Sequence, residues 1–80
     1  MEVRKNLRII FDSTSSMEDY IDACNADHEL RELMNNEEPS ELFYGNPLHR
    51  EIVIHDVTLY QTDKLLDISR EHGKLDFEIY

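Results

Sequence analysis

The sequence predicts a small α+β domain with the element order βαββαβ, the split βαβ pattern of a ferredoxin-like two-layer sandwich. Segments near both ends of the chain alternate apolar and polar residues, as strands with one buried face do. A long segment after the first of them carries apolar residues at helical spacing. The chain has 80 residues and no linker-like stretch, so a single domain over residues 1–80 is expected.

The first predicted strand covers residues 3–11. Its inward positions are Val3, Leu7, Ile9 and Phe11. The hydroxyl-rich stretch that follows offers several helix N-caps, and Ser15 with Glu18 three residues later matches a capping box. These features predict a helix that begins near Ser16.

This helix is expected to run to about Asn35, but its apolar face shifts partway. Met17, Tyr20 and Cys24 share one face, whereas Leu30 and Met34 lie about a third of a turn away. The chain therefore either kinks or breaks into two helices near 25–27, where Asn and Asp side chains can cap a second helix. One kinked helix is the favoured interpretation.

The middle of the chain reads as a loop and two strands. Residues 37–40 form the loop, because proline disfavours helix for the residue before it. A short strand over 42–44 ends at the turn signal Gly45-Asn46-Pro47. The next strand runs from Ile52 to Tyr60, and its inward positions change parity at His55-Asp56, which predicts a bulge or a twist there.

The stretch 62–72 is ambiguous. Thr62 or Asp63 can cap a helix, and Gly73 suits the position just after one. The competing interpretation is a hairpin turning near Gly73, which would give βαβββ, one kinked helix on an antiparallel sheet. Helix is favoured. Residues 74–80 then alternate as a last strand, with Leu75, Phe77 and Ile79 on one face and Asp76, Glu78 and Tyr80 on the other.

Negative charge is concentrated in one segment. The formal net charge is −10, and residues 12–41 contain ten carboxylates against one base, Arg31. Such a field attracts cationic partners and repels nucleic acid and anionic lipid. Direct binding to nucleic acid or to a membrane is therefore not expected.

Part of this charge forms a regular pattern on the predicted helix. Glu18, Asp22, Asn25, Glu29 and Glu32 fall within one narrow arc, about 21 Å long at roughly 1.5 Å per residue. Further acids follow in the loop. The candidate partner-binding residues are Glu18, Asp22, Glu29, Glu32, Glu37, Glu38 and Glu41.

A rigid carboxylate row of this length could imitate the phosphates of a nucleic acid, which repeat about every 3.4 Å along a DNA strand. The sequence thus suggests an inhibitor or regulator that occupies the basic surface of a nucleic-acid-handling protein. Acidic phage or plasmid proteins that block restriction or CRISPR effectors are similar in size and charge, without a shared motif. The alternative is a solvated helix face with no partner.

Residues 10–17 read Ile-Phe-Asp-Ser-Thr-Ser-Ser-Met and resemble the metal-binding loop of a von Willebrand factor A domain, Asp-x-Ser-x-Ser. The resemblance implies Asp12, Thr14 and Ser16 as oxygen ligands of Mg²⁺. Thr14 stands where the family has its first serine, and Ser15 where it has a glycine. A helix N-cap is the favoured interpretation, a cation-responsive protein that uses this loop or the cluster 37–41 is a minor hypothesis, and no metal site is predicted.

Other reactive residues do not form a recognisable catalytic pattern. The four histidines (His28, His49, His55 and His72) match no zinc spacing. Cys24 is expected to be a buried small apolar residue, and a lone thiol favours a reducing cytosol, hence a cytoplasmic protein. No glycine-rich phosphate loop is present, so neither an enzyme nor a cofactor is expected.

Three tyrosines support a second hypothesis of a different class. Tyr44, Tyr60 and Tyr80 lie on or near predicted strands, and tyrosine is enriched at protein interfaces. The chain would then be a structural subunit or a homodimer joined through a sheet edge.

Overall fold

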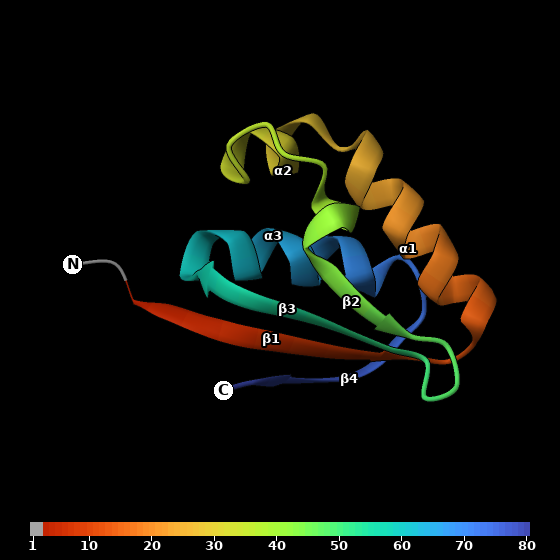
Figure 1. Ribbon diagram of the computed structural model, residues 1–80. Helices are drawn as coiled ribbons and strands as arrows, with labels where there is room; N and C mark the ends of the chain where they lie inside the picture. The colour runs from red at the N-terminus through yellow and green to blue at the C-terminus, as the bar shows by residue number, and fades with distance from the viewer. Residues whose placement is uncertain (1–2) are drawn as a thin grey trace.

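The computed structural model describes residues 3–80, which form one sheet with helices gathered on one side of it (Figure 1). The elements are β1 (Arg4–Phe11), α1 (Thr14–Ala26), α2 (His28–Leu33), the 3₁₀-helix η1 (Pro39–Leu42), β2 (Phe43–Asn46), β3 (Glu51–Thr58), α3 (Leu59–Arg70) and β4 (Lys74–Ile79). The strand order is β2-β3-β1-β4, and each neighbouring pair is antiparallel. The predicted α+β class is confirmed.

The core lies between the sheet and the helices. Two rows of paired, inward-facing positions cross the four strands, Phe43–Ile54–Leu7–Ile79 and Gly45–Ile52–Ile9–Phe77. The helices contribute Met17, Tyr20, Cys24, Leu30, Leu65, Leu66 and Ile68. Tyr20 is the central anchor, because its hydroxyl donates to the Leu65 carbonyl at 3.0 Å and its ring lies 5.0 Å from that of Phe11.

The expectation of one kinked helix is wrong, because the helix breaks at Asp27. This residue has an extended backbone (φ −83°, ψ 113°) and ends α1. Its side chain accepts a hydrogen bond from the Leu30 backbone N–H at 2.9 Å and so caps α2. The new cap compensates for the lost helical turn and lets each helix turn its own apolar face to the core. At the other end, Ser13 rather than Ser15 is the N-cap of α1, since its Oγ accepts from the Ser16 N–H.

The ambiguous stretch is helical, so the βαβββ alternative is wrong. The helix α3 begins at Leu59, earlier than either predicted cap. Thr58 and Gln61 form a capping box, in which each side chain accepts from the other residue's backbone N–H. The preceding strand therefore ends at Thr58, two residues before its predicted end at Tyr60.

Two irregularities shape the strands. The predicted bulge at His55-Asp56 is confirmed: the β1–β3 register shifts there, and Asp56 has φ 60°. A second shift lies in the pairing of β1 with β4, between Asp76 and Lys74, so the predicted clean alternation of 74–80 fails at Leu75. Val3, predicted inward, is 56% exposed, because it precedes the paired part of β1.

Candidate functional site

All seven predicted partner-binding carboxylates are exposed, but they come from four different elements. Two are on α1 (Glu18 and Asp22), two on α2 (Glu29 and Glu32), two in the connection to η1 (Glu37 and Glu38), and Glu41 is on η1 itself. The exposure that the sequence predicted is therefore present. Their arrangement differs from the prediction.

The predicted continuous row does not exist. Asn25, its middle member, is turned toward η1, where its amide exchanges two hydrogen bonds with Ser40 at 3.0 and 3.1 Å. Two residues later the extended Asp27 changes the direction of the chain. We therefore divide the carboxylates by element into two groups, which we call the α1 patch (Glu18, Asp19 and Asp22) and the α2–η1 patch (Glu32, Glu37, Glu38 and Glu41).

Glu29 belongs to neither patch, because it has a counter-charge. The Lys64 ammonium on α3 lies 3.0 Å from the Glu29 carboxylate and 3.6 Å from that of Asp27. The hydrogen bond to Glu29 raises the pKa of Lys64 above its ordinary value. This neutralisation could not be read from the sequence, since 35 residues separate Glu29 from Lys64.

Several other acids in the described chain are paired as Glu29 is, although Asp63, Glu71 and Asp76 form no ion pair there. Arg8 lies between Glu51, at 2.9 Å, and Glu78, at 3.7 Å, on the sheet face that the helices leave open. The other pairs are Arg4 with Asp56 and Arg70 with Asp67. Within residues 3–80, no ion pair involves a member of the α1 patch or the α2–η1 patch.

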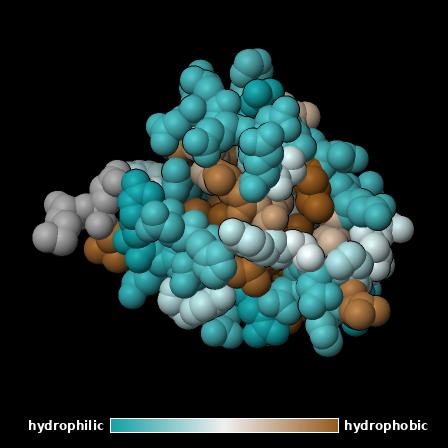
Figure 2. All heavy atoms as spheres, viewed as in Figure 1, coloured by the Kyte–Doolittle hydropathy of each residue, from teal (hydrophilic) through white to brown (hydrophobic). Residues whose placement is uncertain are grey.

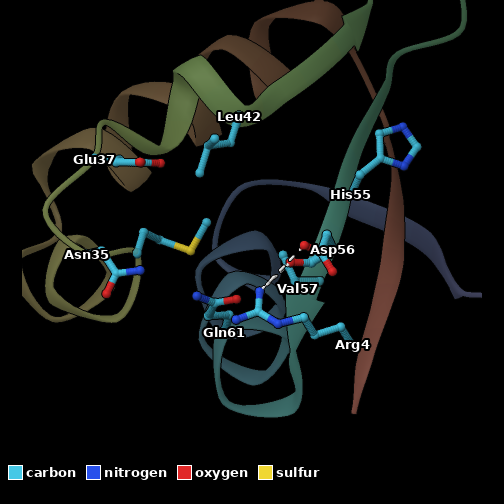
Figure 3. Close-up of a pocket in the computed structure, with 9 residues that line it drawn as sticks. Arg4, Asn35, Glu37, Leu42, His55, Asp56, Val57 and Gln61 are labelled. Carbon is cyan, nitrogen blue, oxygen red and sulfur yellow. Dashed lines mark hydrogen bonds and ion pairs between the residues drawn. The ribbon is translucent and has the colours of Figure 1, made fainter. Parts of the chain in front are cut away.

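A cavity of about 200 Å³ lies beside the α2–η1 patch (Figure 3). Met34, Leu42 and Val57 give it apolar walls, and Glu37 and Arg4 bring opposite charges to it. Figure 2 shows apolar surface gathered in a central hollow and hydrophilic side chains around it. No local sequence signal predicts this cavity, because its lining comes from five separate segments.

The loop that resembles a metal site serves as a helix cap. Besides the bond from Ser16 N–H, the Ser13 and Ser16 hydroxyls lie 3.1 Å apart. Gly73 packs so closely here that an added Cβ would meet the Asp12 carboxylate at 2.6 Å. Across residues 3–80 there is no group of three or more His, Cys, Asp or Glu residues that could hold a metal ion.

The remaining candidates are separated from one another. Cys24 is fully buried, and burial raises the pKa of its thiol to about 12, although the hydrogen bond with Tyr20 acts in the opposite direction. A thiol with so high a pKa is a poor nucleophile at neutral pH. Tyr44 lies edge-on to His55 at 5.3 Å, and Tyr60 is 80% exposed on α3. The three tyrosines that the sequence suggested for an interface are thus exposed, but they lie on or next to three different elements, β2, α3 and β4.

The chain matches no known protein family, no curated protein and no solved structure with which it was compared. In the described residues, no helix has both the length and the apolar character needed to cross a membrane. A functional proposal therefore depends on the charge pattern and the surfaces described above.

Proposed function

We propose that this protein is a small acidic regulator that binds a basic surface of another protein through the α1 patch and the α2–η1 patch. The observation that supports the proposal is the uneven pairing of charge. Several carboxylates on the sheet and near α3 form ion pairs, whereas none of those in the two patches forms one in the described chain. Keeping like charges together without counter-ions destabilises a compact domain, so we attribute this arrangement to binding.

The class of partner follows from the same electrostatics. A one-sign surface accelerates encounter with a surface of the opposite sign and makes affinity sensitive to salt. Basic grooves of this kind are typical of proteins that handle nucleic acids. Because the carboxylates form two patches rather than one row, the partner should present two basic clusters instead of one uninterrupted phosphate channel. Inhibition would result from competition with nucleic acid for those clusters.

Two further assignments belong to this proposal. A cytoplasmic location accords with the free, buried Cys24. A ferredoxin-like sandwich accords with the order of the principal elements and with the strand order β2-β3-β1-β4. An enzymatic role is not proposed, since the titratable groups with raised pKa are either buried in the core or engaged in an ion pair.

The test compares two variants of equal charge. Glu18→Gln/Asp22→Asn/Glu37→Gln changes the patches, and Asp63→Asn/Asp67→Asn/Glu71→Gln changes exposed acids of or next to α3; each moves the net charge from −10 to −7. Both variants and the wild type are used to capture proteins from nuclease-treated lysate, with elution by a salt gradient and identification by mass spectrometry. The captured protein is then tested for displacement from its nucleic acid.

We expect the wild type and the α3 variant to retain the same basic protein and release it at moderate salt. The patch variant should lose it. Equal loss by both variants would show that overall charge governs binding, and equal retention would show that the patches are not needed for it. Either result would overturn the proposal.

A further inference from the structure

Among the strands of residues 3–80, β4 lies at one end of the sheet, and its outer edge pairs with none of them. On its inner side, Tyr80 exchanges both backbone hydrogen bonds with Asn6, at 2.8 and 2.9 Å. Bonded and non-bonded pairs alternate along an antiparallel ladder. Ile79, opposite Leu7, and Phe77, opposite Ile9, are therefore non-bonded pairs. Their N–H and C=O groups point away from β1, toward the free edge.

The same two residues are exposed members of the inward rows. Leu7 and Ile9 at the centre of the sheet are fully buried, whereas Ile79 is 42% and Phe77 43% exposed. The helices cover β1 and β3 and leave the inward side of β4 partly open. The edge thus combines outward-pointing backbone groups with apolar side chains that lack a neighbour on one side.

The other face of β4 is acidic. Asp76 and Glu78 are the direct partners of Ile10 and Arg8, on the open face of the sheet. A strand added to this edge would place alternate side chains beside Phe77 and Ile79 on one face and beside Asp76 and Glu78 on the other. The complementary strand therefore alternates apolar and basic residues.

Charge argues against a second copy of this chain as the occupant. A symmetric antiparallel pair of β4 strands centred on Phe77 would place Asp76 opposite Glu78 twice. Centring the pair on Glu78 would place Glu78 opposite itself. Centring it on Asp76 would place Asp76 opposite itself and Lys74 opposite Glu78, and this pairing would have to run through the irregularity at Leu75. Directly opposed like charges destabilise a cross-strand pair, so each register that pairs most of the strand opposes acid to acid.

We propose that the edge of β4 binds an extended segment of a partner protein in which apolar and basic residues alternate, by addition of a fifth strand to the sheet. In the free protein the Asp76 carboxylate accepts a hydrogen bond from the Phe77 N–H at 2.8 Å. When the strand is added, one of its carbonyl groups accepts the hydrogen bond from the Phe77 N–H in place of the Asp76 carboxylate. Asp76 can then pair with a basic side chain. This surface is separate from the two acidic patches, and the inference does not depend on their function.

The probe is a synthetic hexapeptide that alternates lysine and valine. A control peptide carries N-methyl groups on its valines, which removes the N–H donors that would face β4 and keeps every charge. Binding is followed by titration, and amide hydrogen exchange reports on Phe77 and Ile79. We expect both amides to become protected with the first peptide and not with the second.

Two protein variants complete the test. Asp76→Asn/Glu78→Gln should weaken the Kd by about tenfold, since it removes two cross-strand charge pairs. Asp63→Asn/Glu71→Gln, with the same change in net charge, should bind as the wild type does. Ile79→Pro removes one outward N–H without breaking the β1 ladder and should also weaken binding.

Equal binding of the N-methylated peptide would overturn the proposal, as would unchanged exchange at Phe77 and Ile79. Self-association that Ile79→Pro abolishes would identify a second copy as the occupant and overturn it too. A Glu18→Gln/Asp22→Asn variant should bind the hexapeptide normally, so that failure at this edge is distinguishable from failure of the acidic patches.

Discussion

The helices α1 and α3 lie on the same side of the sheet and are nearly equal in length, yet their outer faces differ in charge. The exposed acids of α1, Glu18, Asp19 and Asp22, have no base within the helix. On α3, Lys64 reaches across to α2, and Arg70 pairs with Asp67 at 3.2 Å. A helix in this layer is therefore stable with mixed charge, and the one-sign surface of α1 is not a requirement of the fold.

Their inner faces differ as well. The α1 helix buries Tyr20 and Cys24, two groups that ionise at high pH, and burial is the largest cause of the raised pKa of each. The α3 helix buries Leu65, Ile68 and Ser69. The anchoring helix of the core thus also holds the two buried groups whose pKa is raised.

The largest expected effect comes from removing the anchor of α1. Tyr20→Ala deletes a fully buried ring and the hydroxyl that bonds to Leu65. Such truncations lower the free energy of unfolding by about 3–5 kcal/mol. A domain of this size has a total stability of roughly that amount, so the variant should be largely unfolded in urea titrations at 25 °C.

The control for this prediction is Tyr60→Ala on α3, where the ring is exposed. A surface change of this kind should alter the free energy of unfolding by less than about 0.5 kcal/mol. If both substitutions shifted the urea midpoint equally, Tyr20 would not have the anchoring role assigned to it.

The next largest effect should be a loss of stability at high pH, which distinguishes the buried groups of α1 from those of α3. The pKa of Cys24 rises from 9.0 in the unfolded chain to about 12 in the folded protein. Above pH 9 the unfolded chain releases a proton that the native state holds, so stability is fully present below pH 9 and is lost as the pH rises toward 12. The free energy of unfolding should fall by up to about 1.4 kcal/mol per pH unit from this group.

Urea titrations at pH 8, 9 and 10 measure this loss, and Cys24→Ala removes the thiol. The variant should be less stable at pH 8, because it leaves a small cavity, and should lose less stability than the wild type between pH 8 and 10. Parallel pH profiles for the two proteins would contradict the assignment. Tyr20, whose pKa is also raised, should contribute a residual loss at still higher pH.

Local sequence predicted much of this fold correctly. The alternation of apolar and polar residues located β1, and the change of inward positions along β3 located the bulge at Asp56. Gly73 was expected after α3, where its φ of 78° and the nearby Asp12 carboxylate disfavour any other residue. These features depend on neighbours in the chain, which the sequence shows directly.

The errors concern competition between alternatives of similar energy. Asp27 could continue a helix or cap a new one, and the packing of α2 on the core decided it. Alternation in β4 placed Phe77 on the apolar face, but this side chain is 43% exposed because the helix layer does not extend over that edge. In the candidate site, exposure of the carboxylates was predictable, whereas the Glu29–Lys64 pair and the turn of Asn25 toward Ser40 depend on tertiary contacts.

The N-caps offer a smaller test of the same pair of helices. Thr58→Ala removes the side-chain oxygen that begins α3, and Ser13→Ala does the same for α1. Each should lower the free energy of unfolding by about 1 kcal/mol. The loss at Thr58 should be the larger, because its partner Gln61 also bonds to the Leu33 carbonyl at 2.8 Å and ties α3 to α2. A larger loss for Ser13→Ala in urea titrations would contradict this ranking.

The smallest expected effect is the change in the free energy of unfolding when one charged side chain is neutralised. The sign of that change is informative. Glu18→Gln removes a like-charge contact with Asp22 one turn away and should raise the free energy of unfolding by a few tenths of a kcal/mol, about 0.2–0.5. Lys64→Gln removes the only base that reaches Asp27 and Glu29 among the described residues, and should lower it.

Salt distinguishes these charge effects from changes in packing. Added salt screens repulsion within a chain of net charge −10 and should stabilise the wild type. Glu18→Gln should reduce this stabilisation and Lys64→Gln should increase it, as urea midpoints in low and high salt would show. The same direction of change in both variants would mean that α1 and α3 do not differ electrostatically, and the functional argument built on the α1 patch would lose its physical basis.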